Sequence, residues 1–295
     1  MQTPWGQIDV VDAHVHFFSR GFFKLLAKQK EGLTIEQAGT TLGWDIPGED
    51  PRELAHRWAG ELDRCQVAGA TLIASLPGDE SSVEAAVETS PDRFHGFFMV
   101  NPLATVTTWQ RRGVACLFPA MHRYSLHDPA VIQLLDSVAA SPNPVVFVHC
   151  GQLSVGVRDK LGLASPLDLR FSNPADVHGL AKRYSSVRFI LPHFGAGYLR
   201  EALMVCDLCP NVYLDTSSSN KWMRLEGLTL ESVFRRALDV AGPKRLLFGT
   251  DSSYFPRGWH RAVFDAQVEA LHKIGISQPD AQAIFGENLV RLVRG

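Results

Sequence analysis

The stretch PVVFVHCG, residues 144–151, bears most directly on the fold because it joins a continuous apolar run to a histidine. A run without apolar–polar alternation is typical of a parallel strand that is buried on both faces of its sheet. The stretches RFILPHFG, residues 188–195, and RLLFGTDS, residues 245–252, repeat this pattern. Together they predict buried parallel strands that are each followed closely by a polar side chain.

On either side of these stretches the chain alternates short β-rich runs with amphipathic segments. Strands are predicted at residues 8–13, 71–75, 95–100, 114–118, 145–149, 187–191, 211–215 and 245–250. Helices are predicted between and after them, at residues 51–67, 80–88, 129–139, 174–184, 198–208, 230–240 and 261–274. The connection at residues 104–112 is weakly patterned, so the sequence does not decide whether it is a full helix.

About eight strand–helix units in 295 residues predict an α/β protein, a (β/α)₈ TIM barrel that forms a single domain over residues 1–295. An open, doubly wound sheet is the alternative architecture. Its glycine-rich phosphate-binding fingerprint follows none of the predicted strands, which favours the barrel. The longest connection, an insertion at about residues 17–48, is predicted to cover the barrel mouth.

The composition excludes several classes of function. The chain has 29 Lys and Arg residues against 31 Asp and Glu residues, and this balance argues against a general nucleic-acid binder or a polybasic membrane anchor. No apolar run approaches the roughly 18 residues of a membrane span, and the N-terminal residues do not resemble a secretory signal. Five scattered cysteines suggest reduced thiols. We therefore expect a cytoplasmic protein that acts on a small molecule.

Side chains that can bind a metal or transfer a proton lie at the ends of several predicted strands. His14 and His16 are two residues apart, a spacing that directs both imidazoles to one face of a strand, while Val15 faces the outer layer. His149, His193 and Asp251 follow three other strands. The C-terminal ends of barrel strands converge on one face, where active sites lie, so these side chains are expected to meet.

These residue types predict a catalytic metal site. Imidazole and carboxylate groups bind zinc and similar ions, and a catalytic site keeps one position open for water. The predicted ligands of a single divalent ion, Zn²⁺ or alternatively Mn²⁺, are His14, His16, His149 and Asp251. His193 is predicted to carry a proton beside the activated water, with Asp251 sharing the catalytic role. Asp12, two residues before His14, is expected to face the same way and orient a ligand.

Five motifs resemble the amidohydrolase superfamily. They are VDAHVHF (11–17), VVFVHCG (145–151), ILPHFGAGY (190–198), LLFGTDSS (246–253) and IFGENLVRL (284–292). The nearest resemblance is to the amidohydrolase-2 branch, with its aminocarboxymuconate-semialdehyde decarboxylase-like, aromatic acid decarboxylase and lactonase-like enzymes. It implies a metal-dependent barrel that catalyses hydrolysis or non-oxidative decarboxylation.

The resemblance also assigns roles to individual residues. It matches His14 and His16 to the first-strand ligands, His149 to the fifth-strand ligand, His193 to the sixth-strand catalytic histidine and Asp251 to the eighth-strand aspartate. Two-metal relatives carry a bridging lysine or glutamate at the end of strand four. The corresponding stretch here, GVACLFP at residues 113–119, has neither, so a mononuclear site is expected. Residues that close a partner's active site are common in this family, so the resemblance also suggests a homodimer.

The loops after the strands contain candidate groups for substrate binding. Arginine presents a planar fork that fits a carboxylate, and aromatic side chains suit an apolar body. The candidates are Arg123, Arg158, Trp222 and Arg257. They favour a small carboxylated substrate.

Three functions are compatible with this pattern. The leading hypothesis is a metal-dependent hydrolase that uses activated metal-bound water on a lactone, ester or amide. The second is a carboxy-lyase that decarboxylates an unsaturated or aromatic acid at the same site. The third is a catalytically inactive metal-binding barrel, against which the presence of His193 argues.

Overall fold

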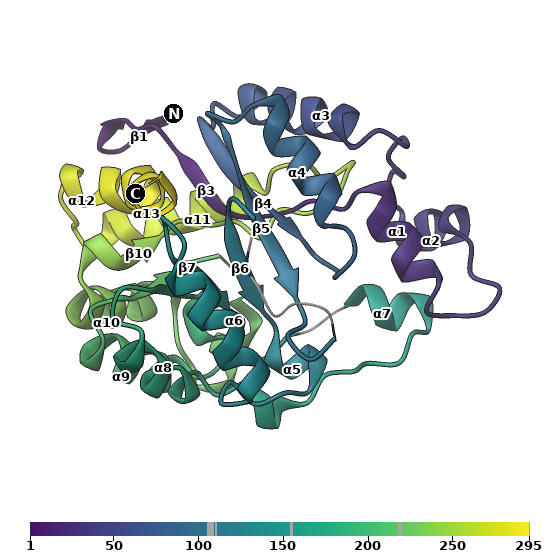
Figure 1. The fold of residues 1–295 in the computed structure, drawn as a ribbon. Coiled ribbons are helices and arrows are strands. Elements are labelled where there is room, and N and C mark those ends of the chain that lie inside the picture. The colour runs from purple at the N-terminus through teal and green to yellow at the C-terminus, as the bar shows by residue number, and fades with distance from the viewer. Residues whose placement is uncertain (105–108, 110, 154–155, 218–219, 295) are drawn as a thin grey trace.

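Eight parallel strands form the centre of the protein (Figure 1). The computed structural model describes residues 1–294 apart from 105–108, 110, 154–155 and 218–219. The strands pair in chain order: β3 (Val11–His16), β4 (Gly69–Ala74), β5 (Phe94–Val100), β6 (Val114–Leu117), β7 (Val145–Val148), β8 (Arg188–Leu191), β9 (Val212–Asp215) and β10 (Leu246–Leu247). A short N-terminal hairpin, β1 (Gln2–Thr3) with β2 (Gly6–Gln7), precedes them.

The first and last strands of the sheet meet and nearly close the barrel. The Ala13 amide donates to the Phe248 carbonyl oxygen at 2.7 Å, and the His16 amide donates to the Ser252 carbonyl oxygen at 2.7 Å. The predicted (β/α)₈ architecture is therefore confirmed, and the open doubly wound sheet is excluded.

Helices surround the sheet in the order that the sequence predicts (Figure 1). Those that match the predicted helices are α3 (Pro51–Arg64), α4 (Glu80–Thr89), α6 (Pro129–Ala139), α8 (Val177–Arg183), α9 (Leu199–Leu208), α10 (Leu230–Ala241) and α11 (Arg261–Lys273). Asp50 and Asp128 cap α3 and α6 by accepting from backbone amides two residues later. The weakly patterned connection at 104–112 lies largely outside the described residues.

Shorter elements complete the chain. They are the helices α5 (Pro119–His122), α7 (Gly156–Leu161), α12 (Gln278–Gln282) and α13 (Asn288–Arg294), the 3₁₀ turns η1 (Leu169–Phe171), η2 (Pro174–Asp176), η3 (Pro192–Gly195), η4 (Asn220–Leu225) and η5 (Pro243–Arg245), and the π-helical turn η6 (Ala283–Glu287). The predicted helix at 174–184 thus begins as the 3₁₀ turn η2 and continues as α8.

The apolar strand residues divide between two hydrophobic clusters. Alternate strand positions, such as Phe97, Phe147 and Ile190, fill the barrel interior, and side chains of α13 pack against this interior cluster. The intervening positions, such as Phe98 and Phe189, pack in a larger outer cluster with the helices. Both faces of the strands are buried, which accounts for the apolar runs without alternation.

A β-bulge in β3 decides which way the first histidines point. The strand starts at Val11, three residues later than predicted, and its register with β4 shifts by one residue between Asp12 and Val15. Val11 and Ala13 lie in the interior cluster before the bulge, whereas Val15 lies in the outer cluster after it. One inserted residue reverses the facing of all later side chains. The bulge therefore turns His14 and His16 toward the barrel interior, as predicted. Asp12, which was predicted to share their face, points to the opposite face of the strand.

The insertion after β3 builds a small hydrophobic cluster of its own. It contains α1 (Arg20–Ala27) and α2 (Ile35–Leu42), which pack together with α7 from the connection after β7 (Figure 1). Lys30 Nζ donates to the Leu161 carbonyl oxygen at 2.9 Å and joins the two segments.

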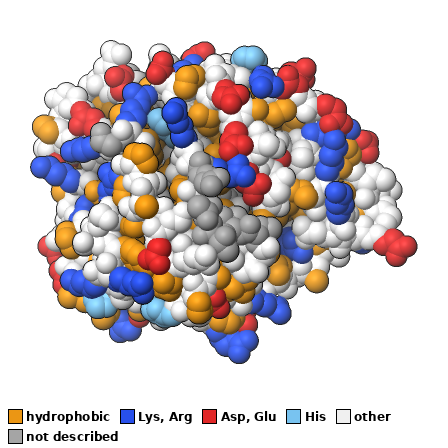
Figure 2. Space-filling model, viewed as in Figure 1, with side chains coloured by type: hydrophobic (Ala, Val, Ile, Leu, Met, Phe, Trp, Pro, Cys, Tyr) orange, Lys and Arg blue, Asp and Glu red, His pale blue; other side chains and the backbone are white. Residues whose placement is uncertain are grey.

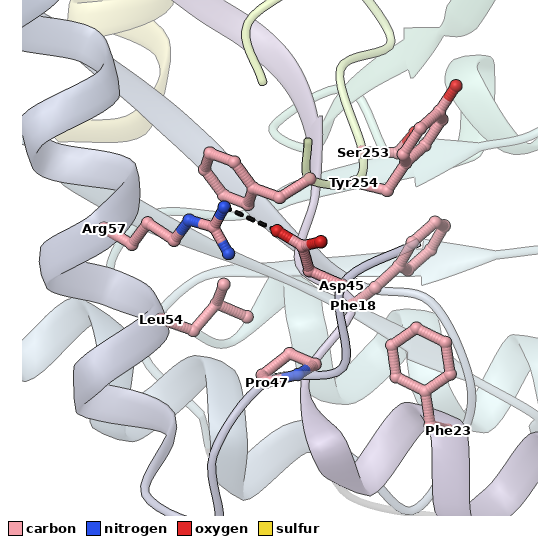
Figure 3. Close-up of a pocket in the computed structure, with 9 residues that line it drawn as sticks. Phe18, Phe23, Asp45, Pro47, Leu54, Arg57, Ser253 and Tyr254 are labelled. Carbon is pink, nitrogen blue, oxygen red and sulfur yellow. Dashed lines mark hydrogen bonds and ion pairs between the residues drawn. The ribbon is translucent and has the colours of Figure 1, made fainter. Parts of the chain in front are cut away.

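The far end of the insertion is tied to α3 and to the loop after β10. Arg57 donates to Asp45 at 2.7 Å and its guanidinium lies 3.9 Å from the centre of the Phe255 ring, beside a pocket of about 10 Å³ (Figure 3). That volume holds about one water molecule. This pocket is a packing gap next to the barrel mouth, since none of the predicted metal ligands lines it.

Basic and acidic side chains are interspersed on the face shown in Figure 2, without a broad area of one sign. None of the helices in the described part of the chain has both the length and the apolar character that crossing a membrane requires.

Candidate metal centre

Three of the predicted ligands meet at the C-terminal end of the barrel. Ligand atoms of His14, His16 and Asp251 all lie within 4.8 Å of one another. His14 and His16 come from β3, and Asp251 lies in the segment after β10 that closes the barrel against β3. Closure of the barrel therefore brings together side chains that are more than 230 positions apart.

Asp215, at the end of β9, orients the His14 ring. His14 Nδ1 lies 2.6 Å from Asp215 Oδ2, and both side chains are fully buried. Burial acts to raise the pKa of Asp215, but the charge of His14 and the hydrogen bond to it outweigh burial and lower that pKa. An ionised carboxylate only accepts hydrogen bonds, so Nδ1 carries a proton toward Asp215 and Nε2 is the nitrogen that faces the site. Burial acts to lower the pKa of His14, but the Asp215 and Asp251 carboxylates outweigh it and raise that pKa, so Nε2 binds a metal ion only after it has released its proton.

Ser75, just beyond β4, contacts the second histidine. Its Oγ lies 2.6 Å from His16 Nδ1, and the same hydroxyl donates to the Ile73 carbonyl oxygen at 3.2 Å. His16 Nε2 faces Asp251 Oδ1 at 3.2 Å. Burial lowers the pKa of His16, which favours the neutral ring that a metal ligand needs.

Asp251 is held in an unusual backbone conformation by its neighbours. Its φ of 59° is in the left-handed region, which costs a residue with a side chain about 1–2 kcal/mol. The fully buried Asp12 carboxylate accepts from the amide and hydroxyl of Thr250, from the His14 amide and from the Trp259 indole. Asp12 thus positions the backbone where β3 meets the segment after β10. Its carboxylate forms no hydrogen bond with the predicted ligand side chains, all of which are among the described residues, contrary to the prediction that it orients one of them.

His149 lies outside the group of three but close to it. Its ring is stacked on Phe118 and its centre is 5.4 Å from that of His193. Burial, followed by the charges of His193 and His14, lowers the pKa of His149 well below its ordinary value. Its Nε2 is buried and meets no hydrogen-bond partner among the described residues. A buried nitrogen without a partner is costly, and a metal ion is one partner that suits it.

His193 is placed differently from the ligands. It follows β8 at a φ of 55°, and its Nδ1 donates to the Ser217 carbonyl oxygen at 2.9 Å. The ring centre is 4.9 Å from that of His14. Burial, followed by the charge of His14, lowers the pKa of His193. Because a carbonyl only accepts, Nδ1 keeps its proton and Nε2 is the nitrogen that can take up another.

These contacts make the site suitable for a cation. Nε2 of His14 faces Asp251 Oδ1 at 3.8 Å, too far for a hydrogen bond. A carboxylate and imidazole lone pairs that face one another repel unless a positive charge lies between them. Nitrogen and oxygen donors of this kind are those that Zn²⁺ and Mn²⁺ accept, so the described residues fit one divalent ion.

Two of the predicted substrate-binding arginines form hydrogen bonds to backbone carbonyl groups of the protein itself. Arg123 is exposed, and its Nε donates to the Pro166 carbonyl oxygen at 2.6 Å. Arg158 donates to the Ala164 carbonyl oxygen and to Gln29, which joins the loop after β7 to the insertion. Trp222, from η4, is 2% exposed within the outer cluster, and its Nε1 meets no partner among the described residues.

Arg257 is the candidate that lies next to a predicted metal ligand, Asp251. Its guanidinium donates to the Asp251 carbonyl oxygen at 3.0 Å and to Ser253 at 2.9 Å, and it covers the face of Tyr254. Its Nε is buried without a partner among the described residues.

The orienting residues Asp215, Ser75 and Ser217 were not predicted as site residues. The sequence contains one signal for them, since each is a polar residue at or just beyond the end of a buried strand. Nothing in their spacing from the histidines indicates which ring each one contacts.

Gly249 allows the last strand to approach this network. A methyl group there would lie 2.8 Å from Asp215 Oδ1 and 2.9 Å from His14 Cβ. We expect Gly249→Ala to displace this pair and weaken Zn²⁺ binding by about 10-fold or more, as loss of an outer partner does. Competition with a chelator measures this. Gly60→Ala is the control, because nothing lies within 4 Å of its added methyl group. If Gly249→Ala bound Zn²⁺ as tightly as wild type, the argument that Gly249 is needed for this close packing would be wrong.

Comparisons with known proteins identify the family of this chain. Residues 11–295 match the model of the family described as Amidohydrolase. The curated protein fluG from Emericella nidulans is 32% identical over 142 residues, which are 47% of this chain and only 15% of that relative. The chain therefore spans a small part of the length of fluG.

Solved structures share the barrel fold. A probable 2-pyrone-4,6-dicarboxylic acid hydrolase from Acinetobacter baumannii has a TM-score of 0.60 at 14% identity, covering 98% of this chain and 100% of its own. A zinc-bound amidohydrolase from Burkholderia multivorans has a TM-score of 0.60 at 15% identity, covering 97% and 99%. A 2,6-dihydroxybenzoate decarboxylase, solved with that acid, has a TM-score of 0.57 at 14% identity, covering 100% and 99%.

Proposed function

Because this chain belongs to the amidohydrolase family, we propose that it is a metal-dependent hydrolase of a small carboxylated lactone, ester or amide. The observation that carries the proposal is the convergence of His14, His16 and Asp251 within 4.8 Å. The unpartnered Nε2 of His149 supports a fourth ligand. The zinc in the Burkholderia multivorans structure supports Zn²⁺ as the ion, with Mn²⁺ as the alternative.

The chain's own groups then divide the chemistry between them. A divalent ion held here would acidify water and polarise a substrate oxygen. Asp251 accepts the proton of the attacking water at a carboxylate oxygen. His193 moves protons at Nε2, since its Nδ1 is committed to the Ser217 carbonyl oxygen at 2.9 Å. Fixing Nδ1 also orients Nε2, so no rearrangement of the ring is needed for proton transfer.

Arg257 supplies the anchor for a carboxylate. Two neighbouring acceptors and the Tyr254 ring hold its guanidinium next to Asp251, and its buried Nε still requires an acceptor. A substrate carboxylate would satisfy that donor and would be placed beside the metal ligands. The dicarboxylic acid in the description of the Acinetobacter baumannii relative is consistent with such an anchor.

Decarboxylation of an unsaturated or aromatic acid is the second candidate. The structural similarity to the 2,6-dihydroxybenzoate decarboxylase favours it, and the same ion and arginine would serve that reaction. The two reactions differ in product, because the hydrolase opens a ring or cleaves an acyl bond with proton release, whereas the lyase releases carbon dioxide.

Elemental analysis of protein purified without added metal tests the proposal. We expect about one divalent ion per chain, with metal content and turnover both lost in His149→Ala. His56→Ala, an exposed position on α3, is the control and should keep both. Assays over lactones and unsaturated carboxylic acids then separate ring opening from carbon dioxide release. Turnover that persists after the metal is removed would overturn the proposal.

A further inference from the structure

A serine hydroxyl lies against the outer nitrogen of His16. Ser75 is 7% exposed, follows the end of β4, and places its Oγ 2.6 Å from His16 Nδ1. This is the shorter of the two polar contacts of the ring, because His16 Nε2 lies 3.2 Å from Asp251 Oδ1.

Two arrangements of hydrogens are compatible with these atoms. In one, Ser75 donates to Nδ1, and Nε2 carries the ring proton and donates to Asp251. In the other, Nδ1 carries the proton and donates to Ser75, and Nε2 is left with a lone pair. Only the second arrangement leaves Nε2 able to bind a metal ion.

The distances favour the second arrangement. A charge-assisted hydrogen bond to a carboxylate is about 2.7–2.9 Å long, whereas His16 Nε2 lies 3.2 Å from Asp251 Oδ1, at the long end of the range for any N–H···O bond and well beyond the 2.6 Å contact of Nδ1 with Ser75. The Ser75 hydroxyl also reaches a second acceptor, the Ile73 carbonyl oxygen, through a long hydrogen bond of 3.2 Å. Its proton can point there while its lone pair accepts from His16 Nδ1.

We infer that Ser75 is a positioning residue that holds His16 with its proton on Nδ1 and its Nε2 lone pair directed at the metal site. The two first-strand histidines are then oriented by different means. The buried His14 uses the Asp215 carboxylate, and the more exposed His16 uses a neutral hydroxyl. This inference rests on the proposed metal site.

The test compares Ser75→Ala, which removes the hydroxyl, with Ser75→Thr, which keeps it. Ser141→Ala is the control, because it removes a hydroxyl that bonds to the Val138 carbonyl oxygen at the other end of the barrel. Nitrogen-detected NMR of the metal-free protein reports which nitrogen of His16 carries the proton. Competition with a chelator gives the Zn²⁺ dissociation constant, and thermal unfolding of the metal-free variants shows that each is folded.

We expect wild type to show His16 protonated on Nδ1, and Ser75→Ala to show a mixture and to bind Zn²⁺ about 10–100-fold more weakly. Ser75→Thr should restore both readouts, and Ser141→Ala should change neither. Unchanged affinity in Ser75→Ala, a folded Ser75→Thr as weak as Ser75→Ala, or wild-type protonation on Nε2 would each overturn the inference. Failure of wild type to bind any metal would instead reject the proposed function, and the NMR result would still decide the role of Ser75.

Discussion

His193→Asn is expected to lower kcat by about 10²–10⁴-fold while the bound metal is retained. The reason is that His193 Nε2 is the proposed proton carrier, while His193 is not part of the cluster of His14, His16 and Asp251. Asparagine suits the test because it tolerates the left-handed backbone at φ 55° and has no basic nitrogen. The measurement is steady-state kinetics together with metal content.

The control for this variant is His127→Asn, an exposed histidine before α6. It should match wild type in kcat and in metal content. If His193→Asn kept wild-type turnover, proton transfer would have to be assigned to another group. If it lost the metal, His193 would belong with the ligands.

Asp215→Asn is expected to reduce both Zn²⁺ affinity and kcat/KM, the latter by about 10²–10⁴-fold. Asp215 Oδ2 contacts His14 Nδ1 at 2.6 Å while Oδ1 accepts from the Ser217 amide at 2.6 Å. An asparagine has only one oxygen for these two donors. If its NH₂ group faces His14, the ring must move its proton to Nε2 and cannot bind the ion. If it faces Ser217, two N–H groups oppose each other in a buried site.

Asp207→Asn on the exposed face of α9 is the control, because it makes the same chemical change away from the site. Metal titration and kinetics on folded protein report both effects. Wild-type affinity in Asp215→Asn would show that His14 does not depend on this carboxylate for its orientation.

The barrel could be predicted because its strands are buried on both faces. That burial leaves continuous apolar runs at β7, β8 and β10, and each run is local in the sequence. The insertion at 17–48 was recognisable only by its length. Its helices and their packing against α7 depend on contacts between segments that are more than 100 residues apart.

The inward orientation of His14 and His16 shows the limit of pattern reasoning. Their spacing of two correctly implies a common face, but the bulge between Asp12 and Val15 decides that this face is the interior. Without the bulge, the facing of Val11 and Ala13 would put Val15 inside and the histidines outside. The same bulge explains why Asp12 bonds to the backbone and to Trp259.

The arginines show a similar limit for substrate binding. Arg123, Arg158 and Arg257 look alike in sequence, since each follows a strand. Arg123 donates to a backbone carbonyl group of another loop, Arg158 donates to one in its own loop and to Gln29 of the insertion, and only Arg257 contacts the segment that carries Asp251. The partner of a long flexible side chain depends on which loops happen to lie beside it.

The amino-acid sequence alone is enough to predict the eight strands, the strand ends that carry polar groups, and the residue types that can bind a divalent ion. Each of these features depends on residues that are close together in the chain. The contacts of Asp215 and Ser75 with the two histidines, and of Arg257 with Asp251, become evident only in the folded protein. Those contacts join residues 59 to 201 positions apart, or depend on a left-handed turn at Asp251, and they exist only once barrel closure has set the strands side by side.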